Sequence, residues 1–155
     1  MNIQRGAAAF LVSFFSTASL LFCASVSASS VKAPCRLQIG LAHISTDLSE
    51  RFGIKAVKVD ASSICHLPQS DVTITVEIWK IDGTRNQLVV KRSVLSAGTT
   101  PSGRAVNNFS TFKICVNRVR TVYFGVAYAK AFIDGKWQYA RHVLSENINP
   151  ICCGT

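Results

Sequence analysis

Apolar residues recur at every second position along most of this chain, and this alternation restricts the fold more than any other feature. In the segment 72–78, Val72, Ile74, Val76 and Ile78 alternate with polar or charged residues. A period of two is typical of strands that bury one face. We therefore predict about seven strands, at residues 37–41, 57–60, 72–79, 87–95, 109–116, 122–133 and 136–144.

Several short strands in one domain are typical of a two-sheet antiparallel sandwich, so we expect an all-β, immunoglobulin-like fold. The hallmarks of an antibody domain are missing. Cys65 precedes the third predicted strand, and Lys113, not tyrosine, stands two residues before Cys115. A short helical turn is predicted only at residues 47–52, where capping oxygens precede it and Gly53 ends it.

Glycine-containing turns separate these strands. Asp134-Gly135 has predicted strands directly on both sides and is typical of a two-residue hairpin turn. Asp82-Gly83 is followed by further polar residues, so we expect a longer loop there. The segment 96–108 is expected to be the longest linker of the domain, and linkers of this kind often carry binding residues.

The N-terminus has the pattern of an export signal. Arg5 precedes a stretch, 6–31, without a single Asp, Glu, Lys or Arg. We predict a signal peptide at residues 1–28, cleaved after Ala28, and one domain at residues 29–155, secreted to the periplasm or the extracellular space. The alternative is an uncleaved segment that anchors the protein in a membrane, although several serines dilute the apolar run.

Cysteine use fits an oxidising compartment. The chain has six cysteines, of which Cys23 lies in the predicted signal segment. Five remain, so we expect a disulfide-stapled domain with two bridges and one spare thiol. The pairing that would fasten both chain ends joins Cys35 to Cys152 or Cys153 and leaves Cys65 to pair with Cys115. We expect no metal site, because the chain has no CxxC motif and only His66 lies beside one of these cysteines.

The charge favours anionic partners. The whole chain carries a net charge of +9. Removal of residues 1–28 takes away one of the 17 Lys and Arg residues and none of the 8 acids, which leaves a charge of +8. Outside the cytosol such a domain would meet an anionic glycan, a cell-wall polymer, a membrane surface or an acidic protein, and we expect no nucleic acid partner. The charge is also compatible with a role in solubility alone.

The last predicted hairpin has the most informative side chains. The Asp134-Gly135 turn would place Arg141 opposite Tyr128 and Val143 opposite Val126. One face then alternates aromatic residues and cations: Tyr128, Lys130, Phe132, Trp137, Tyr139 and Arg141. The other face carries small or neutral residues: Ala127, Ala129, Ala131, Gln138, Ala140 and His142.

Two interpretations of the aromatic and basic face are open. An exposed face would be a candidate ligand surface, because aromatic rings stack on sugars while cations bind acidic groups. A buried face would make the aromatic residues part of the core. The pattern favours the core, because an inner face of alanines alone would bury little apolar surface.

Catalytic signatures are missing from the sequence. We find no GxSxG, HExxH, glycine-rich phosphate loop or papain-type cysteine motif, so we expect neither an enzyme nor a cofactor. The sequence thus predicts a secreted or surface-associated, basic binding module. The alternative is a secreted cationic effector, an inhibitor or a toxin, that acts on another protein or cell.

Overall fold

The structure is a computed structural model that describes residues 34–145 and 150–155. The predicted signal peptide, 1–28, lies outside the described residues, so export stays a prediction. Within the described ranges, no helix is long and apolar enough to cross a membrane.

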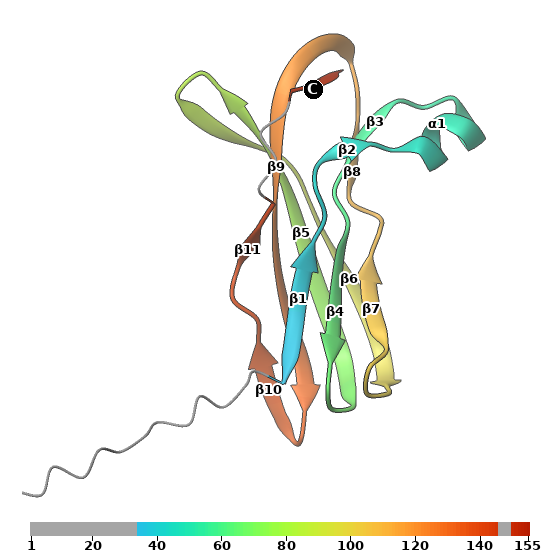
Figure 1. The fold of residues 1–155 in the computed structure, drawn as a ribbon, viewed down its shortest axis with the longest axis vertical. Coiled ribbons are helices and arrows are strands. Elements are labelled where there is room, and N and C mark those ends of the chain that lie inside the picture. The colour runs from blue at the N-terminus through green and yellow to red at the C-terminus, as the bar shows by residue number, and fades with distance from the viewer. Residues whose placement is uncertain (1–33, 146–149) are drawn as a thin grey trace, which may run out of the picture. The chain divides into compact units, whose positions relative to one another are not determined.

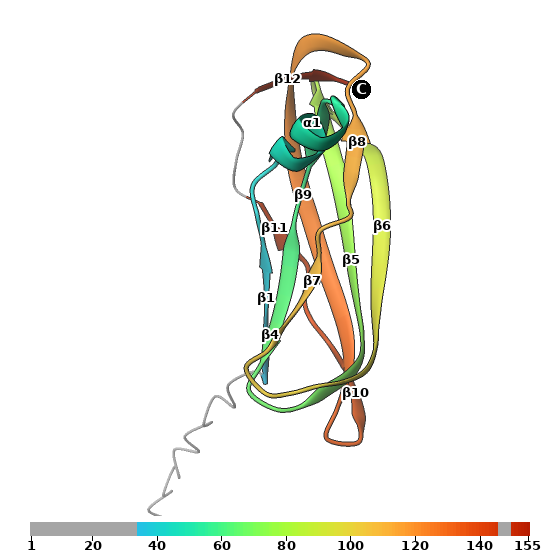
Figure 2. The ribbon, with the colours of Figure 1, turned by 90° about the vertical axis from the view of Figure 1, so that its right-hand side faces the viewer.

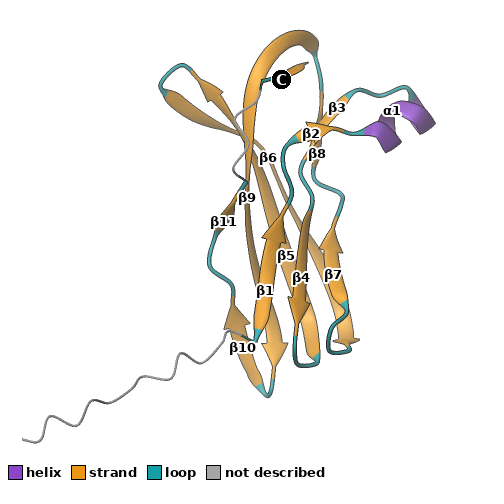
Figure 3. Cartoon of the chain, viewed as in Figure 1, coloured by secondary structure: helices purple, strands orange, loops and turns teal. Residues whose placement is uncertain are grey.

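The domain consists mostly of β-strands with one short helix, α1 (Figure 3), so the predicted β-rich fold is confirmed. The strands are β1 (Cys35–Ile39), β2 (His43–Ile44), β3 (Ala56–Lys58), β4 (Ala61–Cys65), β5 (Gln69–Asp82), β6 (Arg85–Thr100), β7 (Ala105–Asn108), β8 (Phe112–Ile114), β9 (Asn117–Ile133), β10 (Lys136–Tyr139), β11 (Val143–Leu144) and β12 (Ile151–Gly154).

These strands form three antiparallel sheets. The first sheet has the order β1-β4-β7, and the second has the order β10-β9-β5-β6, with β11 and β12 both pairing with β9. A small third sheet has the order β2-β3-β8. Figure 1 shows the long strands β5 and β9 running the length of the domain. From the side, β1 and β4 lie on one side and β5 and β6 on the other (Figure 2).

One hydrophobic cluster joins these sheets. Its centre is the alternating set of β5, since Val72, Ile74, Val76 and Ile78 are each 0% exposed. Full burial of such a side chain contributes about 1.5–3 kcal/mol. The alternation that predicted this strand therefore also identifies the centre of the core.

The two main sheets approach closely in the middle of β9. A Cβ atom on Gly125 would lie 2.6 Å from Val59 Cγ1 and 2.8 Å from Ile39 Cδ1. Real Cβ contacts are longer than this, so only glycine fits here without a shift of its neighbours. Small residues on the inner face of β9 thus let the sheets pack tightly.

Helix α1 (Thr46–Phe52) confirms the predicted helical turn. The Ser45 hydroxyl accepts a hydrogen bond from the Leu48 N–H at 3.3 Å, as an N-cap residue does. Gly53 ends the helix with a φ of 64°, a left-handed conformation that favours glycine.

Of the two Asp-Gly turns, one prediction is confirmed and one is wrong. Asp134 and Gly135 have φ values of 49° and 72° and connect the paired residues Ile133 and Lys136. Asp82 pairs directly with Arg85, so Gly83 and Thr84 form a two-residue turn in place of the predicted longer loop. The polar residues after Gly83 belong to an exposed strand, and this is why their composition resembles a loop.

The long linker predicted at 96–108 is also wrong. Strand β6 continues to Thr100, which pairs with Gln69, and β7 begins at Ala105. Residues 101–104 are all that connects them. The strand predicted at 87–95 is present, but its continuation from Ser96 to Thr100 was missed, because these small polar residues lie at the edge of a sheet, where alternation is not required. Strands β4, β7 and β12 were not predicted either, since they are short and rich in Ala, Ser, Asn or Cys, and neither was β2, which has only two residues.

Two disulfides are present, as predicted, and Cys152 is an exposed free thiol. The bridges are Cys35–Cys65 and Cys115–Cys153, which differs from the predicted pairing. In the first sheet, the register of β1 and β4 places Cys35 directly opposite Cys65, with their Cα atoms 4.0 Å apart. Strand neighbourhood thus decides the pairing, and the chain ends are not joined to each other.

Candidate functional site

The aromatic residues of the β9–β10 hairpin lie on the outer face of the second sheet. Trp137 is 46% exposed and Tyr139 is 74% exposed, while Ala127 and Ala131 on the other face are buried. The core interpretation of this face therefore does not hold. The close packing at Gly125 contributes to this arrangement, because Val59 and Ile39 leave no room for a side chain there. Large side chains on the inner face of β9 are confined to Tyr123 and Ile133.

The hairpin register is as predicted near the turn and changes further along. Trp137 pairs with Phe132 and Tyr139 with Lys130. Val143, however, pairs with Ala127 where the prediction paired it with Val126. The extra residue between β10 and β11 is accommodated by an irregularity of the kind that a β-bulge produces.

Because of this irregularity, Arg141 and His142 lie on the faces opposite to those predicted. Arg141 does not lie opposite Tyr128, and it lines a groove between β1 and β10 together with Arg36. His142 takes its place on the outer face, where its ring packs edge-on against Tyr128 with centroids 4.8 Å apart. The candidate ligand face therefore keeps Tyr128, Lys130, Phe132, Trp137 and Tyr139, loses Arg141 and gains His142.

Contacts between these side chains order the face. The Lys130 Nζ lies 5.0 Å from the centroid of the Trp137 ring, and the rings of Phe132 and Trp137 meet edge-to-face at 5.6 Å. A cation–π contact at an exposed site is worth about 0.5–1 kcal/mol. These contacts hold the Phe132 and Trp137 rings and the Lys130 ammonium group together.

Strands β5 and β6 extend the outer face with residues that the sequence analysis did not select. Glu77 Oε1 accepts hydrogen bonds from Lys91 Nζ at 3.1 Å and from the Tyr128 hydroxyl at 3.2 Å. Its Oε2 accepts one from Trp79 Nε1 at 3.0 Å. Lys91 also lies 5.3 Å from the Tyr128 ring centroid. Glu77, Trp79 and Tyr128 line a shallow depression together with Phe124 and His142.

Glu77 stays ionised in this setting. Burial raises the pKa of Glu77, but the hydrogen bonds from Lys91, Trp79 and Tyr128 together outweigh burial and lower its pKa below the ordinary value of 4.5. Hydrogen bonds with Tyr128 and Glu77 raise the pKa of Lys91. Glu77 and Lys91 are therefore both charged across the physiological pH range. Together with Tyr128 they connect β5, β6 and β9.

Glu77→Gln is expected to destabilise the domain by about 1 kcal/mol at neutral pH. Because the folded pKa of Glu77 is lowered, its contribution is present above the ordinary pKa and is lost as the pH falls through the folded value. The stability difference between native protein and variant should thus narrow as the pH falls below the ordinary pKa of a glutamate. Urea unfolding at several pH values measures it, and Glu50→Gln on the exposed side of α1 is the control. An unchanged difference at acid pH would contradict the ionic role of Glu77.

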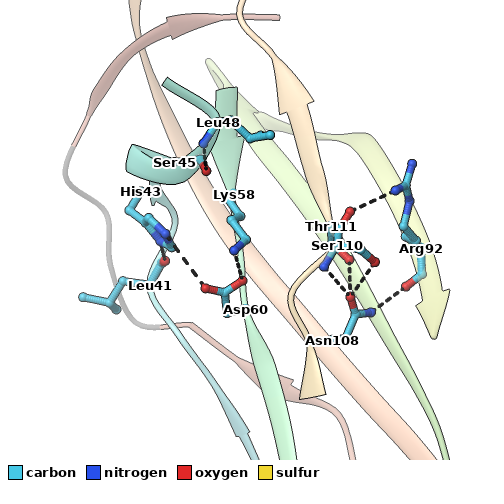
Figure 4. A network of polar contacts seen from close by, with 10 residues as sticks. All are labelled: Leu41, His43, Ser45, Leu48, Lys58, Asp60, Arg92, Asn108, Ser110 and Thr111. Atoms are coloured by element: carbon cyan, nitrogen blue, oxygen red, sulfur yellow. Dashed lines mark hydrogen bonds and ion pairs between the residues drawn. The ribbon is translucent and has the colours of Figure 1, made fainter. Parts of the chain in front are cut away.

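A second polar cluster joins the two sheets (Figure 4). Asn108 Nδ2 donates to the carbonyl oxygens of Ile74 and Arg92, both at 3.1 Å. Its Oδ1 accepts from the Ser110 N–H and from the hydroxyl groups of Ser110 and Thr111. Asn108 is fully buried, so this cluster is structural and offers no room for a ligand.

The third polar cluster surrounds Asp60 (Figure 4). Lys58 Nζ lies 3.0 Å from Asp60 Oδ1, and His43 Nε2 lies 4.0 Å from Asp60 Oδ2. The His43 Nδ1 contacts the Leu41 carbonyl oxygen at 2.9 Å. No serine, threonine or cysteine nucleophile takes part in the contacts of this cluster within the described residues.

Among residues 34–145 and 150–155, no group of three His, Cys, Asp or Glu side chains is placed to hold a metal ion.

Comparison with known proteins finds no family model, no curated protein and no solved structure that matches this chain. The outer face of the second sheet is the surface on which a functional proposal can be built.

Proposed function

We propose that this protein is a secreted, non-enzymatic binding module that holds an anionic glycan on the outer face of the β10-β9-β5-β6 sheet. The observation that carries the proposal is the pairing of Lys130 with Trp137, a tryptophan that is 46% exposed. An exposed indole stacks on a sugar ring, and the neighbouring ammonium group binds a carboxylate or sulfate of the same ligand.

The charge balance of the face supports an anionic ligand. Glu77 is the acid on it, and Lys91 and two neutral donors already occupy its carboxylate oxygens. Lys130 has no such carboxylate partner among the described ion pairs. A cation remains available for an acidic group, while the carboxylate of Glu77 is not free to act as a general base.

We also infer that the domain is immunoglobulin-like. The strand orders β1-β4-β7 and β10-β9-β5-β6 support this inference, because the chain passes between two antiparallel sheets as it does in sandwiches of this class. A binding role on the second sheet is compatible with this architecture.

Trp137→Ala is expected to weaken binding to soluble polygalacturonate about tenfold while leaving the melting temperature nearly unchanged. Lys130→Gln should weaken it to a similar extent and reduce its salt dependence, because one ion contact is lost. Titration calorimetry at two salt concentrations measures both effects. Phe109→Ala and Lys113→Gln are matched controls, because Phe109 is an exposed aromatic under Lys58 and Lys113 is an exposed cation outside the second sheet.

Equal binding by Trp137→Ala and by Phe109→Ala would contradict the proposed site. A loss of several kcal/mol of stability in Trp137→Ala would show that the ring contributes to the core. Tight, salt-insensitive capture of one protein by native chain and Trp137→Ala alike would favour the cationic effector instead.

A further inference from the structure

Large apolar side chains are exposed at the end of the domain opposite the Asp134-Gly135 turn. Phe52 is 65% exposed, Ile114 51%, Val116 79% and Val119 62%. Ile114 is the last residue of β8, Val116 lies in the short connection to β9, and Val119 is the third residue of β9. Phe52 is the last residue of α1. Figures 1 and 2 show this connection and α1 at the same end of the domain. Exposed apolar residues gathered in this way mark interaction surfaces.

Backbone pairing holds the two segments side by side. Ile114 pairs with Ala56, and the Cys115 N–H donates to the Lys55 carbonyl oxygen at 2.9 Å. The Cys115–Cys153 disulfide and the pairing of β12 with the start of β9 fasten the same region. We call the four exposed apolar residues and the cations around them the apex patch. The backbone pairing and the disulfide hold the segments of the apex patch in place, and its apolar side chains are exposed in that arrangement.

The segments that form the apex patch supply cations and contain no acids of their own. Lys55, Lys113, Arg118 and Arg120 are all exposed. The segments 52–59 and 112–122 contain no Asp or Glu. In the described part of the chain, none of these four cations forms an ion pair. A surface that mixes unpaired cations with exposed apolar residues complements an interface that is anionic outside and apolar beneath.

We propose that the apex patch docks the protein on an anionic lipid bilayer, with Val116 and Val119 entering the headgroup region and the surrounding cations contacting lipid phosphates. The end of β8, its connection to β9 and the start of β9 form the patch, and none of the described pockets is lined by Val116 or Ile114. Val119 and Arg120 line one open hollow beside Lys80 and Asp82. A projecting surface needs a partner that deforms around it, and a bilayer does so without a matching cavity. The apex patch is separate from the candidate ligand face, which includes Trp137 on β10.

Co-sedimentation with lipid vesicles tests this proposal. The exported, purified protein is expected to bind vesicles of phosphatidylcholine mixed with phosphatidylglycerol, and to bind phosphatidylcholine alone much more weakly. The double variant Val116→Ser/Val119→Ser should lower the partition coefficient roughly tenfold. The double variant Arg118→Gln/Arg120→Gln should lower the partition coefficient by roughly tenfold or more at low salt. All variants carry the same N-terminus, so any contribution of that segment cancels in the comparison.

Each variant has a control of the same chemistry elsewhere. Leu95→Ser removes a side chain that is 63% exposed on β6, and Lys136→Gln/Arg141→Gln removes two exposed cations from β10 and the residues that follow it. Both controls should bind vesicles like the native protein. Melting curves confirm that every variant is folded.

The free thiol of Cys152 provides a second readout, because Cys152 pairs with Arg120 in the apex patch. A polarity-sensitive dye on Cys152 should shift its emission to shorter wavelength on anionic vesicles. The same dye on Gln138→Cys in a Cys152→Ser background should not shift.

Four outcomes would overturn the proposal. They are failure to bind anionic vesicles, equal binding by the apex variants and their controls, self-association through the apex patch in place of vesicle binding, and binding that selects an acidic protein over vesicles. The glycan proposal is tested by Trp137→Ala and stands or falls separately.

Discussion

Asn108→Asp, a change of one side-chain group with almost no change in volume, is expected to lower the free energy of unfolding by about 3 kcal/mol or more. In the native protein the Asn108 amide nitrogen donates to the carbonyl oxygens of Ile74 and Arg92. Aspartate would place an oxygen against these two oxygens in a fully buried position. Two carbonyl groups would lose their donor, and a charge would be buried without a cation beside it.

Denaturant unfolding measures this effect, and Asn107→Asp is the matched control. Asn107 is the preceding residue of β7 and is exposed, so the same change there should alter stability by less than about 0.5 kcal/mol. Because aspartic acid regains a donor when it is protonated, the Asn108→Asp defect should shrink at low pH. Equal stability of the two variants would show that the cluster around Asn108 does not join the sheets.

The same burial bears on covalent modification. Asn108-Phe109-Ser110 has the sequence of an N-glycosylation site. In the folded domain the Asn108 amide nitrogen is fully buried and makes two hydrogen bonds. A glycan at this position is therefore incompatible with the native fold.

Removal of the Cys115–Cys153 bridge by a double Cys→Ser substitution is expected to cost about 4 kcal/mol in the chain-entropy description of disulfides. This bridge connects residues 38 positions apart and fastens β12 against the start of β9. Its loss should release β12 and the Tyr123 hydroxyl, which donates to the Cys153 carbonyl oxygen at 2.6 Å. Melting and denaturant curves of the purified protein measure the loss.

Cys152→Ser is the control for this experiment. Cys152 is exposed and unbridged, so its replacement should leave the free energy of unfolding nearly unchanged. Peptide mapping of the unreduced protein provides a direct check, because it should recover Cys35 joined to Cys65 and Cys115 joined to Cys153. Recovery of Cys65 joined to Cys115 would contradict the strand pairing of the first sheet.

The sequence predicts most of the residues that share the candidate ligand face, but it does not predict whether this face is buried or exposed. The Asp134-Gly135 turn determined that Trp137 lies beside Phe132 and Tyr139 beside Lys130, because a two-residue turn sets the register on both sides of it. Whether that face is inside or outside depends on the opposite sheet. Val59 and Ile39 come so close to Gly125 that no side chain fits there, and the inner face of β9 holds large side chains only elsewhere along the strand, at Tyr123 and Ile133.

Glu77, Trp79 and Lys91 could not be assigned to the site from the sequence. Their strands have recognisable alternation, but β5 becomes part of the ligand face only because it pairs with β9, with Thr75 opposite Tyr128. Nothing local to either segment specifies that pairing. The pairing of β5 with β9 depends on how the apolar faces of all the strands are buried together in one core.

The alternating residues of β5, the capped turn after Ser45 and the Asp134-Gly135 hairpin were determined by the sequence alone, because each depends on interactions between residues a few positions apart. The cysteine count likewise determined two bridges and one spare thiol. Tertiary structure alone decided that Cys35 meets Cys65, that Arg141 leaves the aromatic face and that this face meets solvent. These outcomes depend on which strands become neighbours and how closely two sheets pack, and both are settled by contacts between residues far apart in the chain.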